Sequence, residues 1–148
     1  MKLGKGPRVH LSIEMDNGRV QSTRLSLSDA FACTGADSTL LGWLAGYAQG
    51  ISAPLPLIRG ASFGERVLQA LQKIPFGKTA SYGEVAALCG QPKAARAVGN
   101  SCHTNPFPLL IPCHRVIRSS GDIGGFAMDL EIKRRLLEFE ASLKDLPH

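Results

Sequence analysis

Apolar and polar residues alternate over residues 9–15 and again over residues 20–27, which is the period of half-buried β-strands. Asn17 and Gly18, between the two segments, are residues that a tight hairpin turn favours. The pattern therefore predicts a β-hairpin. A loop rich in serine, threonine and glycine follows it.

The next apolar positions, between residues 40 and 47, have helical spacing. Asp37 or Ser38 can cap this helix, and Gly50 stands just past its end. The Ser-Ala-Pro-Leu-Pro-Leu segment at residues 52–57 predicts an extended linker.

Two capping boxes predict the starts of two further helices. Ser62 and Glu65 form the first, ahead of apolar residues on one helical face that ends at residues 75–77. Ser81 and Glu84 form the second, ahead of a short helix that stops at Cys89 and Gly90.

A third helix is predicted from Lys93 to Cys102, with Pro92 at its start. Two short helices joined by a glycine-containing turn are typical of a helix-turn-helix. Lys93, Arg96 and Asn100 are spaced i, i+3 and i+7, so they can share one exposed face against a nucleic-acid groove. The alternative is a solvated face of a structural helix.

Prolines bracket the apolar run at residues 105–112, which is too short for a helix and predicts a buried, extended segment that leads to Cys113. A glycine-rich loop follows at residues 121–125. Asp129 can then cap a final helix, in which Ile132, Leu136, Leu137 and Phe139 face the core.

Composition is that of a globular protein of one domain or two small lobes, with 148 residues of which 44% are hydrophobic. No segment resembles a membrane span or a signal peptide, so we expect a soluble, intracellular protein with free thiols. The net charge of +5 suits a polyanionic partner. Most of the excess lies at residues 59–142, which hold 11 Lys and Arg against 7 Asp and Glu.

Cys113 is the candidate nucleophile, because His114 and Arg115 give it the electropositive neighbours that lower a thiol pKa. The alternative is a buried structural cysteine. We adopt that alternative for Cys33, Cys89 and Cys102. The cysteine and histidine spacings do not predict a metal site.

The strings around Cys113 closely resemble the O6-alkylguanine-DNA alkyltransferases, also called methylated-DNA-protein-cysteine methyltransferases. The resemblance is carried by Arg-Ala-Val-Gly at residues 96–99, Asn-Pro at 105–106, Ile-Pro-Cys-His-Arg-Val-Ile at 111–117 and Ser-Gly at 120–121. It spans residues 63–140 and extends weakly to residues 41–47.

The resemblance implies a mixed α/β (α+β) fold in two lobes. A structural, RNase H-like hairpin and helix lobe would occupy residues 1–51, and a linker residues 52–58. A helical, winged helix-turn-helix lobe at 59–142 would bind DNA and carry the active site, and 143–148 would form a tail. The implied protein is a monomer that acts on double-stranded DNA in the cytoplasm, or in the nucleus of a eukaryote.

The implied activity is a single, irreversible transfer of an alkyl group from O6-alkylguanine, and less well from O4-alkylthymine, to Cys113 after nucleotide flipping, with no cofactor or metal. The implied catalytic residues are Cys113, His114, Glu140, Tyr82 and Asn105. The implied DNA-binding residues are Arg96, Lys93, Asn100, Tyr82 and Arg115. The implied substrate pocket contains Phe126, Ala127, Ile117 and Met128.

The chain departs from the family pattern at residues 126–128, where the family usually has tyrosine, a small or hydroxyl residue and glycine. Three other functions remain open. An alkyltransferase-like damage-binding protein would have weak or no transfer, a helix-turn-helix regulator would only bind DNA, and a cysteine hydrolase would turn over repeatedly.

Overall fold

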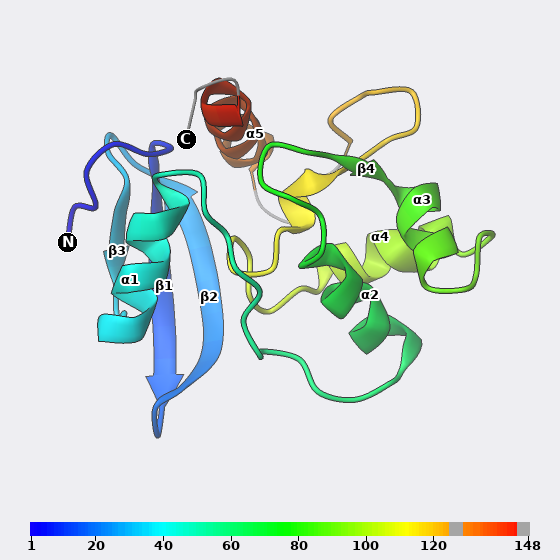
Figure 1. Cartoon of the computed structure of the whole chain (residues 1–148), viewed down its shortest axis with the longest axis horizontal. Coiled ribbons are helices and arrows are strands. Elements are labelled where there is room, and N and C mark those ends of the chain that lie inside the picture. The colour runs from blue at the N-terminus through cyan, green and yellow to red at the C-terminus, as the bar shows by residue number, and fades with distance from the viewer. Residues whose placement is uncertain (125–128, 145–148) are drawn as a thin grey trace.

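The computed structural model describes residues 1–124 and 129–144, which form two lobes joined by an extended segment (Figure 1). A small sheet with one helix against it makes the N-terminal lobe, and three short helices gather in the other lobe. The last helix, α5 (Leu130–Lys144), lies beside both. It continues past residue 142, where the sequence predicted a tail.

The predicted hairpin is confirmed as strands β1 (Val9–Asp16) and β2 (Arg19–Leu27), which pair in antiparallel register. Asn17 and Gly18 both have positive φ, at 52° and 74°, as a type I′ turn requires. Helix α1 (Ser38–Tyr47) begins at the predicted cap, where the Asp37 carboxylate accepts from the backbone N–H of Leu40.

One strand of this lobe was not predicted. Strand β3 (Ala32–Thr34) lies in the expected loop and pairs in parallel with β1, which gives the order β2-β1-β3. A strand of three residues is too short to show a period of two, so only its partner defines it. The pairing buries Cys33.

Both capping boxes are present in the C-terminal lobe. Ser62 begins helix α2 (Phe63–Leu71) and Ser81 begins helix α3 (Tyr82–Leu88), and in each the Ser hydroxyl and the Glu carboxylate accept from the other residue's backbone N–H. Gly90 ends α3 with a φ of 79°. Strand β4 (Ala80–Ser81) pairs in parallel with β5 (Val116–Ile117), a two-stranded sheet that the sequence did not predict.

Helix α4 (Ala95–His103) begins later than predicted, and its start has no side-chain cap. Lys93 therefore precedes the helix, in a turn closed by the Ala94 N–H and the Gln91 carbonyl. The predicted i, i+3, i+7 helical face that began at Lys93 is wrong in that residue, because Pro92 and the turn delay the first helical hydrogen bond.

The segment before Cys113 is buried as predicted, but it is not extended. The Ile111 N–H donates to the Phe107 carbonyl at 2.8 Å, and Leu109 turns the chain with a φ of 73°. Cys113 opens a single 3₁₀ turn, η1 (Cys113–Arg115). The nucleophile candidate is therefore held by two consecutive tight turns.

The lobes share one hydrophobic core and are joined by hydrogen bonds. The Thr23 hydroxyl on β2 donates to the Pro108 carbonyl at 2.9 Å, and its N–H donates to the Pro106 carbonyl at 2.9 Å. Arg135 on α5 donates to the carbonyls of Arg8 and Ser28. The N-terminal lobe is thus attached directly to the turn that carries Cys113.

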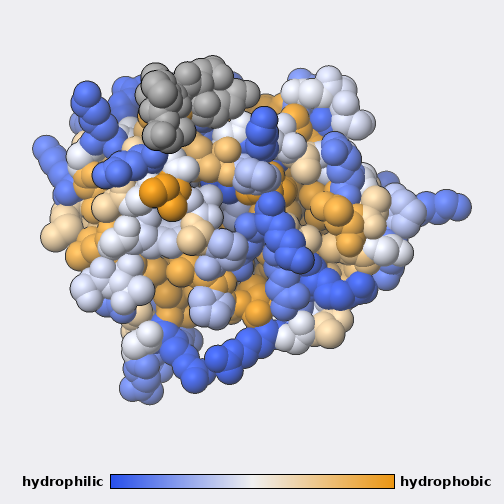
Figure 2. Space-filling view, in the orientation of Figure 1, coloured by the Kyte–Doolittle hydropathy of each residue, from blue (hydrophilic) through white to orange (hydrophobic). Residues whose placement is uncertain are grey.

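The face in Figure 2 mixes hydrophilic and hydrophobic side chains, with many of the most hydrophilic ones projecting from its rim and lying along the middle of the view. Within the described residues, no helix has the length and apolar character needed to cross a membrane.

Candidate active site

A buried carboxylate on α5 organises the site. Glu140 is 1% exposed and accepts from side chains of two other elements. Its Oε1 accepts from Arg115 Nε at 2.7 Å and from the Gly77 N–H at 3.4 Å. Its Oε2 lies 2.6 Å from His114 Nε2, 2.7 Å from Tyr47 Oη and 3.2 Å from Arg115 Nη2.

Arg115 holds this carboxylate rather than a DNA phosphate. Its guanidinium also donates to the Ile74 carbonyl at 2.9 Å and to the Ser52 hydroxyl at 3.2 Å, and the residue is 1% exposed. The expectation that Arg115 binds DNA is therefore wrong. A buried guanidinium needs a counter-charge, and Glu140 provides it.

The hydrogen bonds to Glu140 fix the tautomer of His114. Although burial alone would raise it, the pKa of Glu140 falls to about 2, because His114 and Arg115 favour the charged carboxylate. An ionised carboxylate can only accept, so neutral His114 carries its proton on Nε2. Its Nδ1 then has a lone pair, and this buried atom has no hydrogen-bond partner among the described residues.

Burial lowers the pKa of His114, and the positive charges of Arg115 and Lys133 lower it further, against an opposing effect of Glu140. The imidazole is therefore neutral near pH 7. A neutral imidazole with a bare Nδ1 can accept a proton.

Cys113 is 6% exposed, and burial raises the pKa of its thiol. A hydrogen bond from Asn105, the charge of Lys133 and backbone N–H groups oppose that rise. The side chains of His114 and Arg115 are not among these influences and the net shift is upward, so the expected lowering of the Cys113 pKa by these two side chains is wrong. The free cysteine is held as a thiol that loses its proton when it reacts.

Asn105 links the end of α4 to the turn before Cys113. Its amide Nδ2 donates to the Ile111 carbonyl at 3.0 Å, and its Oδ1 accepts from the Phe107 N–H at 2.9 Å. Such side-chain bonds to the backbone fix a turn that has no regular ladder. These two hydrogen bonds fix the turn that leads to Cys113.

Tyr82, the first residue of α3, lies beside the site. Burial raises the pKa of its hydroxyl, and the nearby thiols of Cys102 and Cys113 raise it further, while Arg118 lowers it. The phenol is therefore protonated at neutral pH and is able to donate. Its position at the start of α3 is fixed by the Ser81 capping box.

Arg96, Asn100 and Lys93 are all exposed, the first two on α4 and the third just before it. Val98 on the opposite side of α4 is fully buried. A cationic and polar face is thus presented by a helix whose other face is anchored in the core.

Of the expected pocket residues, Ile117 is half-buried at the end of β5. Phe126, Ala127 and Met128 lie outside the described residues.

Two functional candidates escaped the sequence reasoning. Lys133 is 1% exposed and its ammonium donates to the Val116 carbonyl at 2.8 Å, close enough to Cys113 to favour a thiolate there. Its spacing of i, i+3 and i+7 with Leu136 and Glu140 was the available signal. Tyr47 was predicted only as part of an apolar helix face, and nothing local indicates that its hydroxyl meets Glu140.

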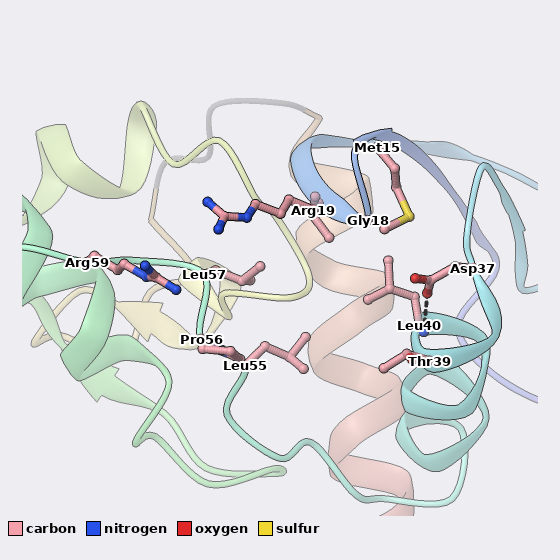
Figure 3. Close-up of a pocket in the computed structure, with 11 residues that line it drawn as sticks. Met15, Gly18, Arg19, Asp37, Thr39, Leu40, Leu55, Pro56, Leu57 and Arg59 are labelled. Carbon is pink, nitrogen blue, oxygen red and sulfur yellow. Dashed lines mark hydrogen bonds between the residues drawn. The ribbon is translucent and has the colours of Figure 1, made fainter.

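A separate cavity of about 500 Å³ lies between the hairpin turn, the start of α1 and the linker (Figure 3). The Arg19 side chain extends toward the side of Arg59 and the linker, and Asp37 and Leu40 lie across from them. No cysteine or histidine occurs among the described residues that line it. The buried nucleophile and its proton acceptor therefore lie elsewhere.

A family model described as the 6-O-methylguanine DNA methyltransferase DNA-binding domain matches residues 62–142. A methylated-DNA–protein-cysteine methyltransferase of Mycobacterium bovis is 45% identical over 114 residues, which cover 77% of this chain and 68% of that protein. The human protein of the same name is 49% identical over 86 residues, which cover 57% of this chain and 42% of the human protein.

The solved structures agree. The Mycobacterium tuberculosis protein OGT, determined in complex with DNA, aligns with a TM-score of 0.73 at 33% identity. The alignment covers 90% of this chain and 94% of the other. It supports the mixed α/β arrangement over both lobes.

Proposed function

The chain belongs to the O6-methylguanine-DNA methyltransferase family and so acts in DNA repair by alkyl transfer, and we propose that Cys113 is the residue that accepts the alkyl group. The observation that carries this proposal is that Cys113 and His114 are consecutive and buried in η1, and that His114 and Arg115 are both hydrogen-bonded to Glu140. This arrangement provides a nucleophile, a proton acceptor and a fixed counter-charge in one place.

In the proposed reaction, Cys113 Sγ forms a bond to the alkyl carbon while the bond from that carbon to guanine O6 breaks. The electron pair stays on the guanine, and the thiol proton moves to His114 Nδ1, directly or through a water. Tyr82 donates to guanine N3. In the net reaction guanine gains the proton that the thiol lost, and the stable thioether limits each molecule to one reaction.

The burial of the Cys113 thiol supports nucleotide flipping. A base within a duplex cannot bring its O6 substituent to a sulfur that is 6% exposed, so the nucleotide must leave the stack, at a cost of a few kcal/mol. We propose that Arg96 fills the gap from α4, while Lys93 and Asn100 contact the backbone of duplex DNA. O4-alkylthymine would be a poorer substrate of the same site.

The pocket wall is proposed to include Ile117 and residues 126–128. Asn105 positions the turn before Cys113, and Glu140 holds His114. No step requires a cofactor or a metal.

The direct test is to react the protein with duplex DNA that contains O6-methylguanine and to measure its mass. We expect a gain of one methyl group per molecule, with no second turnover. Trypsin releases residues 97–115 as one peptide that contains both Cys102 and Cys113, so fragment spectra must assign the methyl group. Cys113→Ala should abolish the gain and retain DNA binding, which phosphate contacts dominate.

Other results would support other functions. Tight lesion binding without a mass gain would indicate an alkyltransferase-like damage-binding protein, and repeated product release a hydrolase. Methylation of Cys102 would refute the proposed acceptor.

Arg96→Ala provides a test of flipping. Its transfer rate from duplex DNA should fall at least about tenfold, the equivalent of one lost contact of about 1.4 kcal/mol. Its rate with the free base O6-benzylguanine should stay the same, because a free base needs no flipping. Asn100→Ala, on the same helix, is the control for a general loss of backbone contacts, and an equal fall with both substrates would contradict the proposed role.

A further inference from the structure

The N-terminal lobe contributes one side chain to the Glu140 cluster. Tyr47, the last residue of α1, is fully buried, and its hydroxyl donates to Glu140 Oε2 at 2.7 Å across 93 positions of the chain. The same oxygen lies 2.6 Å from His114 Nε2. Tyr47 and His114 therefore share one acceptor atom.

We propose that Tyr47 is a positioning residue of the alkyl-transfer site, whose hydroxyl sets the proton affinity of His114 by competing with it for Glu140 Oε2. This inference rests on the proposed function, in which His114 takes the thiol proton. It gives the N-terminal lobe a direct role in the chemistry.

Glu140 Oε2 has more hydrogen-bond donors around it than lone-pair sites, so the donors compete. A carboxylate offers about two lone-pair sites on each oxygen. Oε2 receives three donors, from Tyr47, His114 and Arg115. A strong donor from Tyr47 withdraws negative charge from this oxygen, so the oxygen stabilises an imidazolium less.

Packing of the Tyr47 ring holds its hydroxyl in place. The ring is surrounded by aromatic rings of both lobes at centroid distances of 5.3–5.9 Å, which belong to Phe31, Trp43, Phe76 and Phe139. Burial and the negative charge of Glu140 raise the pKa of Tyr47 well above its ordinary value. The phenol therefore stays protonated and stays a donor.

Other charged and titratable groups also face His114. Lys133 comes from α5, and Arg115 and Cys113 lie beside His114 in η1. All three remain in a Tyr47→Phe variant, which keeps the ring and removes only the hydroxyl. Any change at His114 in that variant therefore reports the shared oxygen.

The experiment is an NMR titration of His114 in the full chain, with its signal assigned by its loss in His114→Gln. Tyr47→Phe should raise the pKa of His114 by about 0.5 to 1 unit, the scale of the net contribution of one ordinary hydrogen bond. Thr23→Val is the matched control, because it removes another buried hydroxyl that joins the lobes but does not touch Glu140. An unchanged or lower His114 pKa in Tyr47→Phe, or an equal rise in Thr23→Val, overturns the proposal.

A second measurement covers the case in which Tyr47→Phe does not fold. The chain has two tyrosines, so 3-fluorotyrosine incorporated into Tyr82→Phe labels Tyr47 alone. The more acidic fluorophenol donates more strongly and should lower the pKa of His114. No change in this protein also overturns the proposal.

The transfer rate as a function of pH separates this inference from the proposed function. If His114 is the proton acceptor, the acidic limb of the profile should move to higher pH in Tyr47→Phe, by the same amount as the His114 pKa measured by NMR. A shift by NMR with an unmoved limb would uphold the effect of Tyr47 on the His114 pKa and refute His114 as the proton acceptor.

Discussion

At the scale of single residues, the site depends on buried charges that compensate one another. Glu140 and Arg115 are both 1% exposed, and neither has access to water that could replace its partner. Breaking such a pair costs about 3–5 kcal/mol, because the remaining charge stays buried. Glu140 and Arg115 balance each other's charge, so the Cys113 thiol can stay neutral until it reacts.

Glu140 also predicts how stability depends on pH. Its pKa is about 2 in the folded protein and 4.5 in the unfolded chain. A depressed pKa contributes stability that is fully present above pH 4.5 and is lost as pH falls toward 2. We expect the urea midpoint of the wild-type protein to fall as pH is lowered from 5 to 3.

The matched variants are Glu140→Gln and Glu138→Gln on the same helix, the second at an exposed position. Glu140→Gln should lose about 3–5 kcal/mol at pH 7 and show a flatter dependence between pH 5 and 3. Glu138→Gln should follow the wild type. Parallel pH curves for all three proteins would contradict the assignment.

The residue scale is also where sequence reasoning reached least far. Cys113 was singled out by its sequence neighbours, His114 and Glu140 were assigned their roles through the resemblance, and the structure brings His114 and Glu140 together. The environment of Arg115 was misjudged, because sequence neighbours do not reveal that a guanidinium turns inward to a carboxylate 25 positions away. Tyr47 was missed for the same reason.

At the scale of elements, local signals predicted most boundaries. The starts of α1, α2 and α3 agree with the expected caps, because a cap is a contact within four residues. Strands β3, β4 and β5 were missed, since two or three residues form a strand only through a distant partner. Helix α4 begins later than predicted because Pro92 and the turn between Gln91 and Ala94 delay its first helical hydrogen bond.

The caps provide a test of how α3 presents Tyr82. Ser81→Ala and Ser62→Ala each remove one capping box and should each cost about 1 kcal/mol of stability. Only Ser81→Ala should also slow transfer from duplex DNA, since Tyr82 follows Ser81 directly. Chemical denaturation and single-turnover kinetics measure the two effects, and equal slowing in both variants would contradict the argument.

At the scale of the whole molecule, the two lobes form one structure. The hydrophobic core is continuous from β1 to α5, and buried hydrogen bonds from Thr23 and Tyr47 cross between the lobes. Composition left one domain or two small lobes open, and the resemblance implied two lobes with a linker, because composition marks the linker but cannot show contacts beyond it. A chain with one core unfolds in one transition.

This predicts coincident unfolding by two probes. Trp43 on α1 is the only tryptophan and reports the N-terminal lobe, while far-UV circular dichroism reports chiefly the helices of the other lobe. In urea both signals should give the same midpoint. Thr23→Val should lower that common midpoint, because the loss of one buried hydrogen bond reduces the free energy of unfolding by about 1 kcal/mol. Two separate midpoints would mean that the lobes are independent, and the N-terminal lobe could not then hold Tyr47 against Glu140 with the constancy that its proposed role requires.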